Sequence, residues 1–465
     1  MRIFRHYVSA PAVAMLLVEV WLIGLILYAF MTTGRPAAMF SAEYLPEARI
    51  AAIFAVIISL IMCSIGAYDK LSLSDYRHLL SRLIVSLVLC VVVLVIIVYF
   101  NKQSPDRFLG YNGQALVLAM FAVFPAIFIT RVMYFRSIRD RGPDRRILVV
   151  GAGPSADRIE RYARSHLDFN AKIVGYIAVT NEEIAVPQDK VIKNEDSLAK
   201  LATRLGVTEI VVAITERRGF PTGPLLECRL QGFIVTNFLN FWERETRQVM
   251  LDLLDPSWII YSDGFQLVGI INAALKRSFD SLVSLSILLL TSPILILAAL
   301  AVRLDSPGPI FYKQERVGMN GKVFSIVKLR TMRSDAEKGG VPQWAGSNDP
   351  RVTRVGGFLR LTRIDEIPQV FNVLWGDMSF VGPRPERPFF VESLARDIPY
   401  YRERLRMRPG ITGWAQINYP YGASIEDAKA KLSYDLYYIK NYSIFFDLII
   451  AIGTVQVVLW NKGAR

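Results

Sequence analysis

The stretch 281-SLVSLSILLLTSPILILAALAV-302 is apolar throughout and long enough to cross a lipid bilayer as one helix. Ser292 and Pro293 interrupt it near the middle, where a proline removes a backbone hydrogen bond and bends the helix. Basic residues flank it on both sides, among them Lys276 and Arg303. Because cations stay on the cytoplasmic side of a membrane, two interpretations are open: a kinked span, or a helix that enters the bilayer and returns.

Apolar residues are abundant throughout the chain and make up 52% of its 465 residues. This composition is typical of a membrane protein rather than of a soluble enzyme. The formal net charge of +13 indicates anionic partners such as phospholipid headgroups or nucleotides. The three cysteines have neither the spacing of a metal site nor a pairing pattern, so the sequence does not indicate an oxidising compartment.

Four long apolar runs occupy the first third of the chain, and each approaches the roughly 20 residues that cross a bilayer as a helix. They are residues 8–30, 50–67, 83–100 and 115–130. The first has no convincing cleavage site, so we interpret it as an anchor rather than a removed signal peptide. Cations gather after the fourth run, at Arg131, Arg136, Arg139, Arg141, Arg145 and Arg146. This bias predicts that both ends of the bundle, and everything after it, are cytoplasmic.

The segment 146-RILVVGAGPSADRIERYA-163 has the pattern of a buried strand, a glycine turn and a helix. Gly151, Gly153 and Ala156 match the Gly-x-Gly-x-x-Ala form of the dinucleotide-binding fingerprint. Further strand-like runs, with a helical run between them, follow at residues 171–179 and 208–214. We therefore predict a Rossmann-like α/β domain in this part of the chain.

Two interpretations of this domain are open: it binds a nucleotide, or it is a degenerate relative that keeps only the tight turn. The second is favoured because the sequence has no clear acidic residue after the second strand at the expected spacing. The region also has no Tyr-x-x-x-Lys pair, which disfavours a nucleotide-sugar redox enzyme.

The chain becomes strongly basic after residue 311. The cations are Lys322, Lys328, Arg330, Arg354, Arg360, Arg363, Arg384, Arg406 and Arg408. Arginine binds phosphate oxygens with two parallel hydrogen bonds, so we predict phosphate binding by this group. A surface that faces anionic lipid headgroups is the alternative.

Asp365 and Glu366 are adjacent carboxylates among these cations. Pro368 fits the first turn of a helix, which places Asp365 near a helix N-terminus, where free N–H groups favour anions. An N-cap aspartate is the plainer interpretation. An ionised Asp365 can also attack phosphorus, while its neighbour holds Mg²⁺. We expect the arginines to depress the pKa of Asp365, so that activity is lost only well below neutral pH.

Two further features complete this region. Pro383 and Pro385 restrict the backbone around Arg384, which suits recognition of a planar base or a phosphate. The last apolar run, residues 444–460, contains Asp447 and is short for a span, so we expect a helix that lies in the membrane interface.

The C-terminal block resembles the bacterial sugar transferases, the monotopic phosphoglycosyl transferases that start capsule, exopolysaccharide and O-antigen synthesis. The matching strings are the Ser292-Pro293 break, KLRTM, DPRVTRVGGFLRLTRIDEIPQ, NVLWGDMSFVGPRPE and RPGITGWAQIN, within residues 272–465. By this resemblance, Ser292 and Pro293 match the break that makes a helix re-entrant, over about residues 279–303. The resemblance decides between the two interpretations of that stretch in favour of re-entry.

The resemblance also implies a mechanism. A UDP-hexose binds with Mg²⁺, Asp365 attacks its β-phosphate and expels UMP, and Glu366 ligates the magnesium. Undecaprenyl phosphate then takes the sugar phosphate from Asp365. The positions that match contacts to the nucleotide or phosphates are Arg360, Pro383, Arg384 and Pro385. From the basic group we add Lys328 and Arg330 as substrate-binding candidates.

The expected protein is a multi-pass protein of the bacterial inner membrane with three parts. These are a four-helix transmembrane bundle (1–138), a Rossmann-like middle domain (139–268) and an α-rich catalytic domain on the cytoplasmic side with the re-entrant helix (269–465). The expected partners are UDP-hexose, undecaprenyl phosphate and membrane lipids, without nucleic acid; a homodimer is inferred from the resemblance alone. The alternative function is a non-catalytic membrane module that senses nucleotides or exports polysaccharide.

Overall fold

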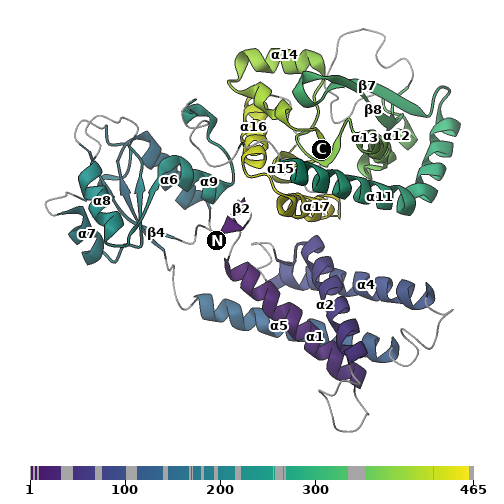
Figure 1. The fold of residues 1–465 in the computed structure, drawn as a ribbon, viewed down its shortest axis with the longest axis horizontal. Coiled ribbons are helices and arrows are strands. Elements are labelled where there is room, and N and C mark those ends of the chain that lie inside the picture. Colours follow the sequence, from purple (N-terminus) through teal and green to yellow (C-terminus); the bar gives the residue numbers. More distant parts are fainter. Residues whose placement is uncertain are drawn as a thin grey trace.

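The computed structural model describes residues 2–3, 6–7, 10–32, 45–68, 76–100, 113–139, 145–166, 169, 171–179, 183–192, 197–214, 221–254, 256, 265, 269–333, 351–420, 422 and 424–459. Within these residues the chain forms an N-terminal helical bundle, a middle α/β domain and a C-terminal, mostly helical domain (Figure 1). A short antiparallel pair, β1 (Arg2–Ile3) with β2 (His6–Tyr7), precedes the bundle.

The N-terminal bundle consists of apolar helices at the four predicted places. They are α1 (Ala10–Thr32), α2 (Leu45–Ile65), α4 (Tyr76–Phe100) and α5 (Gly113–Arg139). Ile23, Leu27 and Ile58 are buried between the helices, whereas Trp21 and Phe121 are exposed on the outside. The helices α1, α2 and α5 are each long and apolar enough to cross a membrane. Apolar side chains on both the inside and the outside of the bundle are those of a membrane protein.

A buried ion pair joins the bundle internally. The Arg131 guanidinium contacts Glu19 with Nε at 2.7 Å from Oε1 and Nη2 at 2.8 Å from Oε2. The Tyr68 hydroxyl donates to the same carboxylate at 2.6 Å, and Arg131 also donates to the carbonyl of Ala67. Arg131 is expected after the fourth span, but it lies inside α5 and is fully buried. Glu19 makes this burial possible because it supplies the opposite charge that a buried arginine needs. Arg141 lies outside the described residues.

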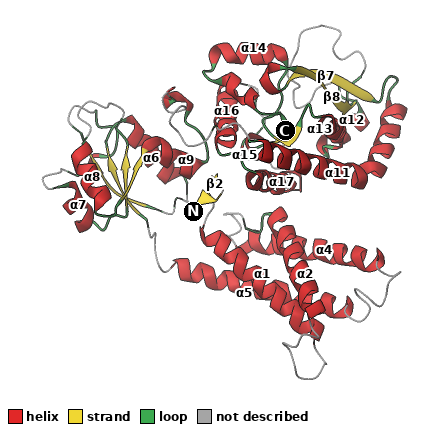
Figure 2. Ribbon diagram, in the orientation of Figure 1, coloured by secondary structure: helices red, strands yellow, loops and turns green. Residues whose placement is uncertain are grey.

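The middle domain contains a parallel four-stranded sheet of order β4-β3-β5-β6. Its strands are β3 (Arg146–Val150), β4 (Lys172–Ile177), β5 (Glu209–Val212) and β6 (Ile234–Asn237). Its helices are α6 (Pro154–Ser165), α7 (Leu198–Arg204), α8 (Thr222–Leu230) and α9 (Phe238–Thr246). Alternate strand residues face α7 and α8 on one side, and α6 and α9 on the other. The sheet is therefore covered on both faces, as parallel sheets usually are (Figure 2).

The glycine turn after β3 is required by close packing. Gly151 has a φ of +117°, and a Cβ there would lie 2.9 Å from the carbonyl carbon of Ala213. Its N–H donates to the Ile177 carbonyl at 2.8 Å. Contacts inside the domain thus account for a glycine here without a bound nucleotide.

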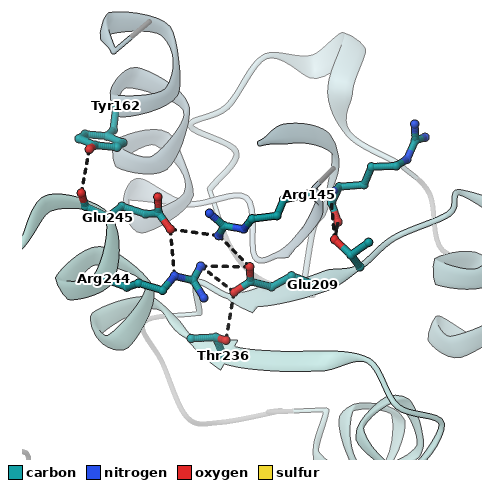
Figure 3. Close-up of polar contacts among 8 residues, drawn as sticks. Arg145, Tyr162, Glu209, Thr236, Arg244 and Glu245 are labelled. Atoms are coloured by element: carbon teal, nitrogen blue, oxygen red, sulfur yellow. Dashed lines mark hydrogen bonds and ion pairs between the residues drawn. The ribbon is translucent and has the colours of Figure 1, made fainter. Parts of the chain in front are cut away.

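A charged cluster lies at the N-terminal ends of the two inner strands, β3 and β5 (Figure 3). Buried Glu209, at the start of β5, accepts hydrogen bonds from Arg145 Nη2 at 2.9 Å and Thr236 Oγ1 at 3.1 Å. Arg244 of α9 approaches Glu209 to 2.8 Å, and Glu245 contacts both arginines, at 3.0 Å from Arg145 and 2.9 Å from Arg244. The cluster fixes α9 to the beginning of the domain.

The C-terminal domain is α-rich, as expected, with two small strand pairs. The helices are α11 (Ile270–Asp305), α12 (Arg354–Leu361), α13 (Val370–Trp375), α14 (Pro388–Asp397), α15 (Trp414–Asn418), α16 (Ile425–Lys440) and α17 (Ile444–Leu459). The strands are β7 (Phe311–Val317), antiparallel to β8 (Val323–Leu329), and β9 (Ser379–Val381), parallel to β10 (Gly410–Thr412). Trp414, Tyr437 and Phe446 lie in its main core.

The long helix α11 contains Ser292 and Pro293 in its interior, and Figure 1 shows it turning part-way along. Around the turn its side chains are strongly exposed, with Leu289 at 75% and Leu290 at 76%. Both ends pack on the same domain. In the first part, Arg277 donates to the Val373 carbonyl of α13 and Asp280 accepts from Ser379 of β9, whereas Ala298 beyond the turn packs in a cluster with residues of β8 and α12. An apolar tip therefore projects from a domain that holds both ends of the helix.

The last helix, α17, connects the C-terminal domain to the bundle. Asp447, which made this run look too short to span the membrane, is buried and contacts Lys276 Nζ at 2.7 Å and the Tyr438 hydroxyl at 2.7 Å. Further along, Gln456 Nε2 donates to the Cys63 carbonyl of α2 at 2.8 Å. Asp447 is thus an anchor to the domain core, and the expected position of α17 in the membrane interface stays a prediction.

Candidate active site

Asp365 lies where a short 3₁₀ helix, Ile364–Gln369, leads into α13. The 3₁₀ helix begins after Arg363, whose φ of +60° makes a sharp turn from α12. The predicted place of Asp365 in a first helical turn is confirmed. The plainer interpretation, an N-cap aspartate, is wrong, because the cap position is occupied by Arg363 and has no side-chain cap bond.

Glu366 is held by cations from three segments of the domain. Its Oε1 accepts from Lys328 Nζ at 2.7 Å and from Arg384 Nη2 at 2.9 Å, while Oε2 lies 3.8 Å from Arg363 Nη1. Burial alone would raise the pKa of Glu366, but Lys328 and Arg384 outweigh it and hold this pKa well below its usual range. Glu366 is therefore ionised at neutral pH.

Asp365 has the opposite electrostatic character. The residue is only 8% exposed, and burial, followed by the negative charge of Glu366, raises its pKa to about 6. Lys328, Arg360 and Arg363 oppose this shift without reversing it. The expected depression of this pKa is thus wrong, because the sequence shows the nearby cations but not the loss of water around the carboxyl.

The cations predicted around the pair separate into two groups. Lys328, at the end of β8, and Arg384 both contact Glu366, and burial lowers the pKa of Lys328. Arg360 lies close enough to lower the pKa of Asp365, and its Nε donates to Thr331 Oγ1 at 2.9 Å. These three cations surround the carboxylate pair, as the sequence suggested.

Arg330, also predicted to bind substrate, has a different role. Its guanidinium is buried against the end of α11, where Nη2 donates to the Ser306 carbonyl at 2.6 Å and Nη1 to the Pro307 carbonyl at 3.2 Å. Carbonyl groups at a helix C-terminus attract a cation in this way. Residues two apart in a strand face the same side, so a strand that continued through residue 330 would place Arg330 on the side of Lys328. Because β8 ends at Leu329, the Arg330 side chain can take another direction.

The segment with Pro383, Arg384 and Pro385 connects β9 to α14 and lines a small pocket, which touches neither Asp365 nor Glu366 and is linked to Glu366 through Arg384. The other residues of the pocket are Val317, Gly318, Glu386, Val391, Arg404, Leu405, Met407 and Pro409. Sequence reasoning missed Arg404, which lies behind the loop. It is one of several arginines in 402-RERLRMR-408, and nothing local distinguishes it from its exposed neighbours.

The arrangement suits nucleophilic chemistry on phosphorus. Asp365 is buried, titrates below neutral pH and is surrounded by cations, so that at neutral pH it supplies a poorly hydrated carboxylate where an anionic group can bind. Glu366 stays ionised and organises Lys328 and Arg384. Two adjacent carboxylates thus have different surroundings and opposite pKa shifts.

Comparison with known proteins gives a consistent result. Residues 271–461 match the family model of the bacterial sugar transferases. An exopolysaccharide production protein of Rhizobium leguminosarum bv. phaseoli is 46% identical over 190 residues, which are 39% of this chain and 93% of that protein.

Two longer relatives carry more specific names. The UDP-N-acetylgalactosamine-undecaprenyl-phosphate N-acetylgalactosaminephosphotransferase of Aeromonas hydrophila is 41% identical over 241 residues, or 52% of this chain and 56% of the relative. The UDP-glucose:undecaprenyl-phosphate glucose-1-phosphate transferase of Escherichia coli K12 is 45% identical over 196 residues, or 42% of each. The matched part therefore spans about half the length of these two relatives.

Proposed function

The chain belongs to the bacterial sugar transferase family, and from that membership we propose that it transfers a hexose 1-phosphate from a UDP-hexose to undecaprenyl phosphate. The reaction releases UMP and is the first membrane step of exopolysaccharide, capsule or O-antigen synthesis. The observation that carries the proposal is the carboxylate pair, in which cations keep Glu366 ionised and burial keeps Asp365 poorly solvated.

In the first step, a carboxylate oxygen of Asp365 attacks the β-phosphorus of the UDP-hexose. The bond from this phosphorus to the bridging oxygen breaks, and UMP leaves with the electron pair. The sugar phosphate is then bound to Asp365 as an acyl phosphate. Arg360, Lys328 and Arg384 are close enough to the pair to balance the negative charge of the diphosphate.

In the second step, a phosphate oxygen of undecaprenyl phosphate attacks the same phosphorus. The acyl-phosphate bond breaks and restores the Asp365 carboxylate, and the product is a lipid diphosphate sugar. Because the nucleophile is regenerated, the cycle requires no further reactant. Burial of Asp365 excludes water, which would otherwise hydrolyse the acyl phosphate.

Magnesium is proposed as the cofactor, and the residues fit it. Lys328 and Arg384 donate to Oε1 of Glu366, while Arg363 Nη1 lies 3.8 Å from Oε2, beyond hydrogen-bond distance, so Oε2 retains capacity to ligate a metal ion. One carboxylate together with substrate phosphates is a usual donor set for Mg²⁺. When bound, the ion would neutralise diphosphate oxygens. Glu366 would hold it, and Lys328 would keep Glu366 ionised.

The membrane placement is proposed from α11. If this helix spanned the bilayer, its ends would lie on opposite sides, yet both ends pack on one domain. We propose that it enters the cytoplasmic leaflet and returns near Pro293, with Leu289 and Leu290 in lipid. The catalytic domain then lies on the cytoplasmic face of the bacterial inner membrane, where UDP-sugars are available.

For the middle domain we propose a Rossmann-like fold that no longer depends on a nucleotide. The sheet order β4-β3-β5-β6 and the packing around Gly151 support this interpretation. The homodimer stays a prediction from the family resemblance.

The test is UMP release by the purified full-length chain with Mg²⁺, undecaprenyl phosphate and a panel that includes UDP-glucose and UDP-N-acetylgalactosamine. Asp365→Asn should abolish release. Asp397→Asn is the matched control, because this exposed aspartate at the end of α14 lies outside the site. With a radiolabelled sugar and no acceptor, wild-type protein should retain label. Undiminished release by Asp365→Asn would overturn the mechanism, and no release from any UDP-sugar would favour the non-catalytic module.

A further inference from the structure

The loop from Pro383 to Glu386 is fixed through its carbonyl groups. Two of its four residues are prolines, which have no N–H to donate, so the loop depends on donors from elsewhere. Each of its carbonyls accepts a hydrogen bond: Pro383 from Gly410 N at 2.9 Å, Arg384 from Arg404 Nη2 at 3.0 Å, Pro385 from Arg316 Nη1 at 3.1 Å and Glu386 from Val317 N at 2.9 Å. A side chain, Arg404, therefore determines where the backbone of Arg384 lies.

Arg404 is itself held from several directions. Its side chain is only 7% exposed, and its guanidinium lies 2.8 Å from Oδ2 of Asp435, whose side chain is 2% exposed. Its Nη1 donates to the Tyr401 hydroxyl at 2.8 Å, and the guanidinium carbon lies 5.2 Å from the centre of the Tyr401 ring. A buried guanidinium with these partners has one orientation, because rotation would leave a charge unpaired.

From this chain of contacts we infer that Arg404 and Asp435 are positioning residues of the transferase site. Asp435 orients Arg404, Arg404 holds the main-chain carbonyl of Arg384, and the Arg384 guanidinium thereby reaches Glu366 at 2.9 Å. The inference rests on the proposed function. Asp435 of α16 and Arg404 of the segment before β10 both act through Arg384.

Loss of these contacts should slow the reaction, because hydrogen bonds at 2.9–3.0 Å hold Arg384 in place only while each partner keeps its position. Loss of the Arg404 bond removes a donor that holds the Arg384 carbonyl. A shift of about 1 Å at a binding group can cost up to about 100-fold in rate. Lysine retains the charge of Arg404 but not its planar fork, so it cannot reproduce the same set of directions to Asp435 and Arg384.

Steady-state kinetics of the full-length enzyme test the inference, with UMP release as the readout. Arg404→Lys and Asp435→Asn should each raise KM for the UDP-sugar about tenfold or more. KM for undecaprenyl phosphate should stay within about twofold, because the loop is proposed to contact the nucleotide side. Arg396→Lys, an exposed arginine of α14, is the matched control and should have wild-type constants.

A double-mutant cycle separates positioning from a general loss of structure. If Arg404 acts through Arg384, then Arg404→Lys should have little further effect in an Arg384→Ala background. Tyr401→Phe removes one partner of Arg404 without removing charge, and should raise KM by a smaller factor in a folded protein. Wild-type KM in both Arg404→Lys and Asp435→Asn, or fully additive effects with Arg384→Ala, would overturn the inference. An inactive wild-type enzyme would instead contradict the proposed function.

Discussion

Replacing the proposed nucleophile should make the protein more stable, and the structure gives the size of the effect. In the native state, burial raises the pKa of Asp365 from its ordinary value of 3.8 to about 6. The native state therefore binds this proton more tightly than the unfolded state does. The stabilisation that this tighter proton binding gives is complete below pH 3.8 and is lost as the pH rises through about 6. At pH 7.5 the wild-type protein carries the full cost of a buried charge.

At 1.36 kcal/mol for each pKa unit, this cost is about 3 kcal/mol as an upper value. Asparagine has the same shape as aspartate and is neutral at every pH. Asp365→Asn should therefore raise the free energy of unfolding at pH 7.5 by up to about 3 kcal/mol, which corresponds to about 6–12 °C in the unfolding midpoint of a domain of roughly 200 residues. The gain should shrink at pH 5, where Asp365 of the wild type is already protonated.

The assay is thermal unfolding of the full-length protein in detergent at pH 5 and 7.5, without magnesium or nucleotide, followed by tryptophan fluorescence. Glu366→Gln is the matched control with the opposite sign, because it leaves Lys328 and Arg384 without their carboxylate and should lower the midpoint. An Asp365→Asn protein that is less stable than wild type at pH 7.5, or equally shifted at both pH values, would refute the reasoning.

UMP release should fall as the pH is lowered through about 6, because Asp365 must be ionised to attack phosphorus; a pH–rate profile with its acid limb near 4 would contradict this. Lys328→Met should lower kcat/KM by about 100-fold, since Glu366 loses a cation at 2.7 Å, and Lys328→Arg should recover part of the activity. Arg131→Met leaves Glu19 buried with the Tyr68 hydroxyl but without its counter-charge, which should destabilise the bundle by about 3–5 kcal/mol and lower the thermal midpoint; an unchanged midpoint would show that the ion pair contributes no stability.

Features set by local pattern could be predicted from the sequence. The four apolar helices follow from the length of their apolar runs, and β3 with its turn follows from a buried strand before Gly151. The carboxylate pair is recognisable because Asp365 and Glu366 are adjacent and surrounded by basic residues in the same stretch. Each of these signals is contained within about 20 residues.

Features that depend on distant segments could not be predicted. The raised pKa of Asp365 arises from burial by the folded domain, and Arg330 is bound by carbonyls of Ser306 and Pro307 that follow a helix more than 20 residues earlier. Arg404 meets Asp435 across 31 positions of sequence. A list of charges along the chain gives neither their hydration nor their partners, and these decide which cations face the site.

The contacts between the middle and C-terminal domains matter for the design of a shorter version of this protein. Lys440 and Asn441 contact Glu243 at 2.6 Å and 2.9 Å, and the Trp414 indole donates to the Arg247 carbonyl at 3.1 Å. Removal of everything before α11 would take away Glu243 and the Arg247 carbonyl and would expose the surface that carries Lys440 and Trp414. A truncated protein that begins at α11 would therefore benefit from a neutral residue in place of Lys440, since the removed Glu243 supplies the counter-charge in the full chain.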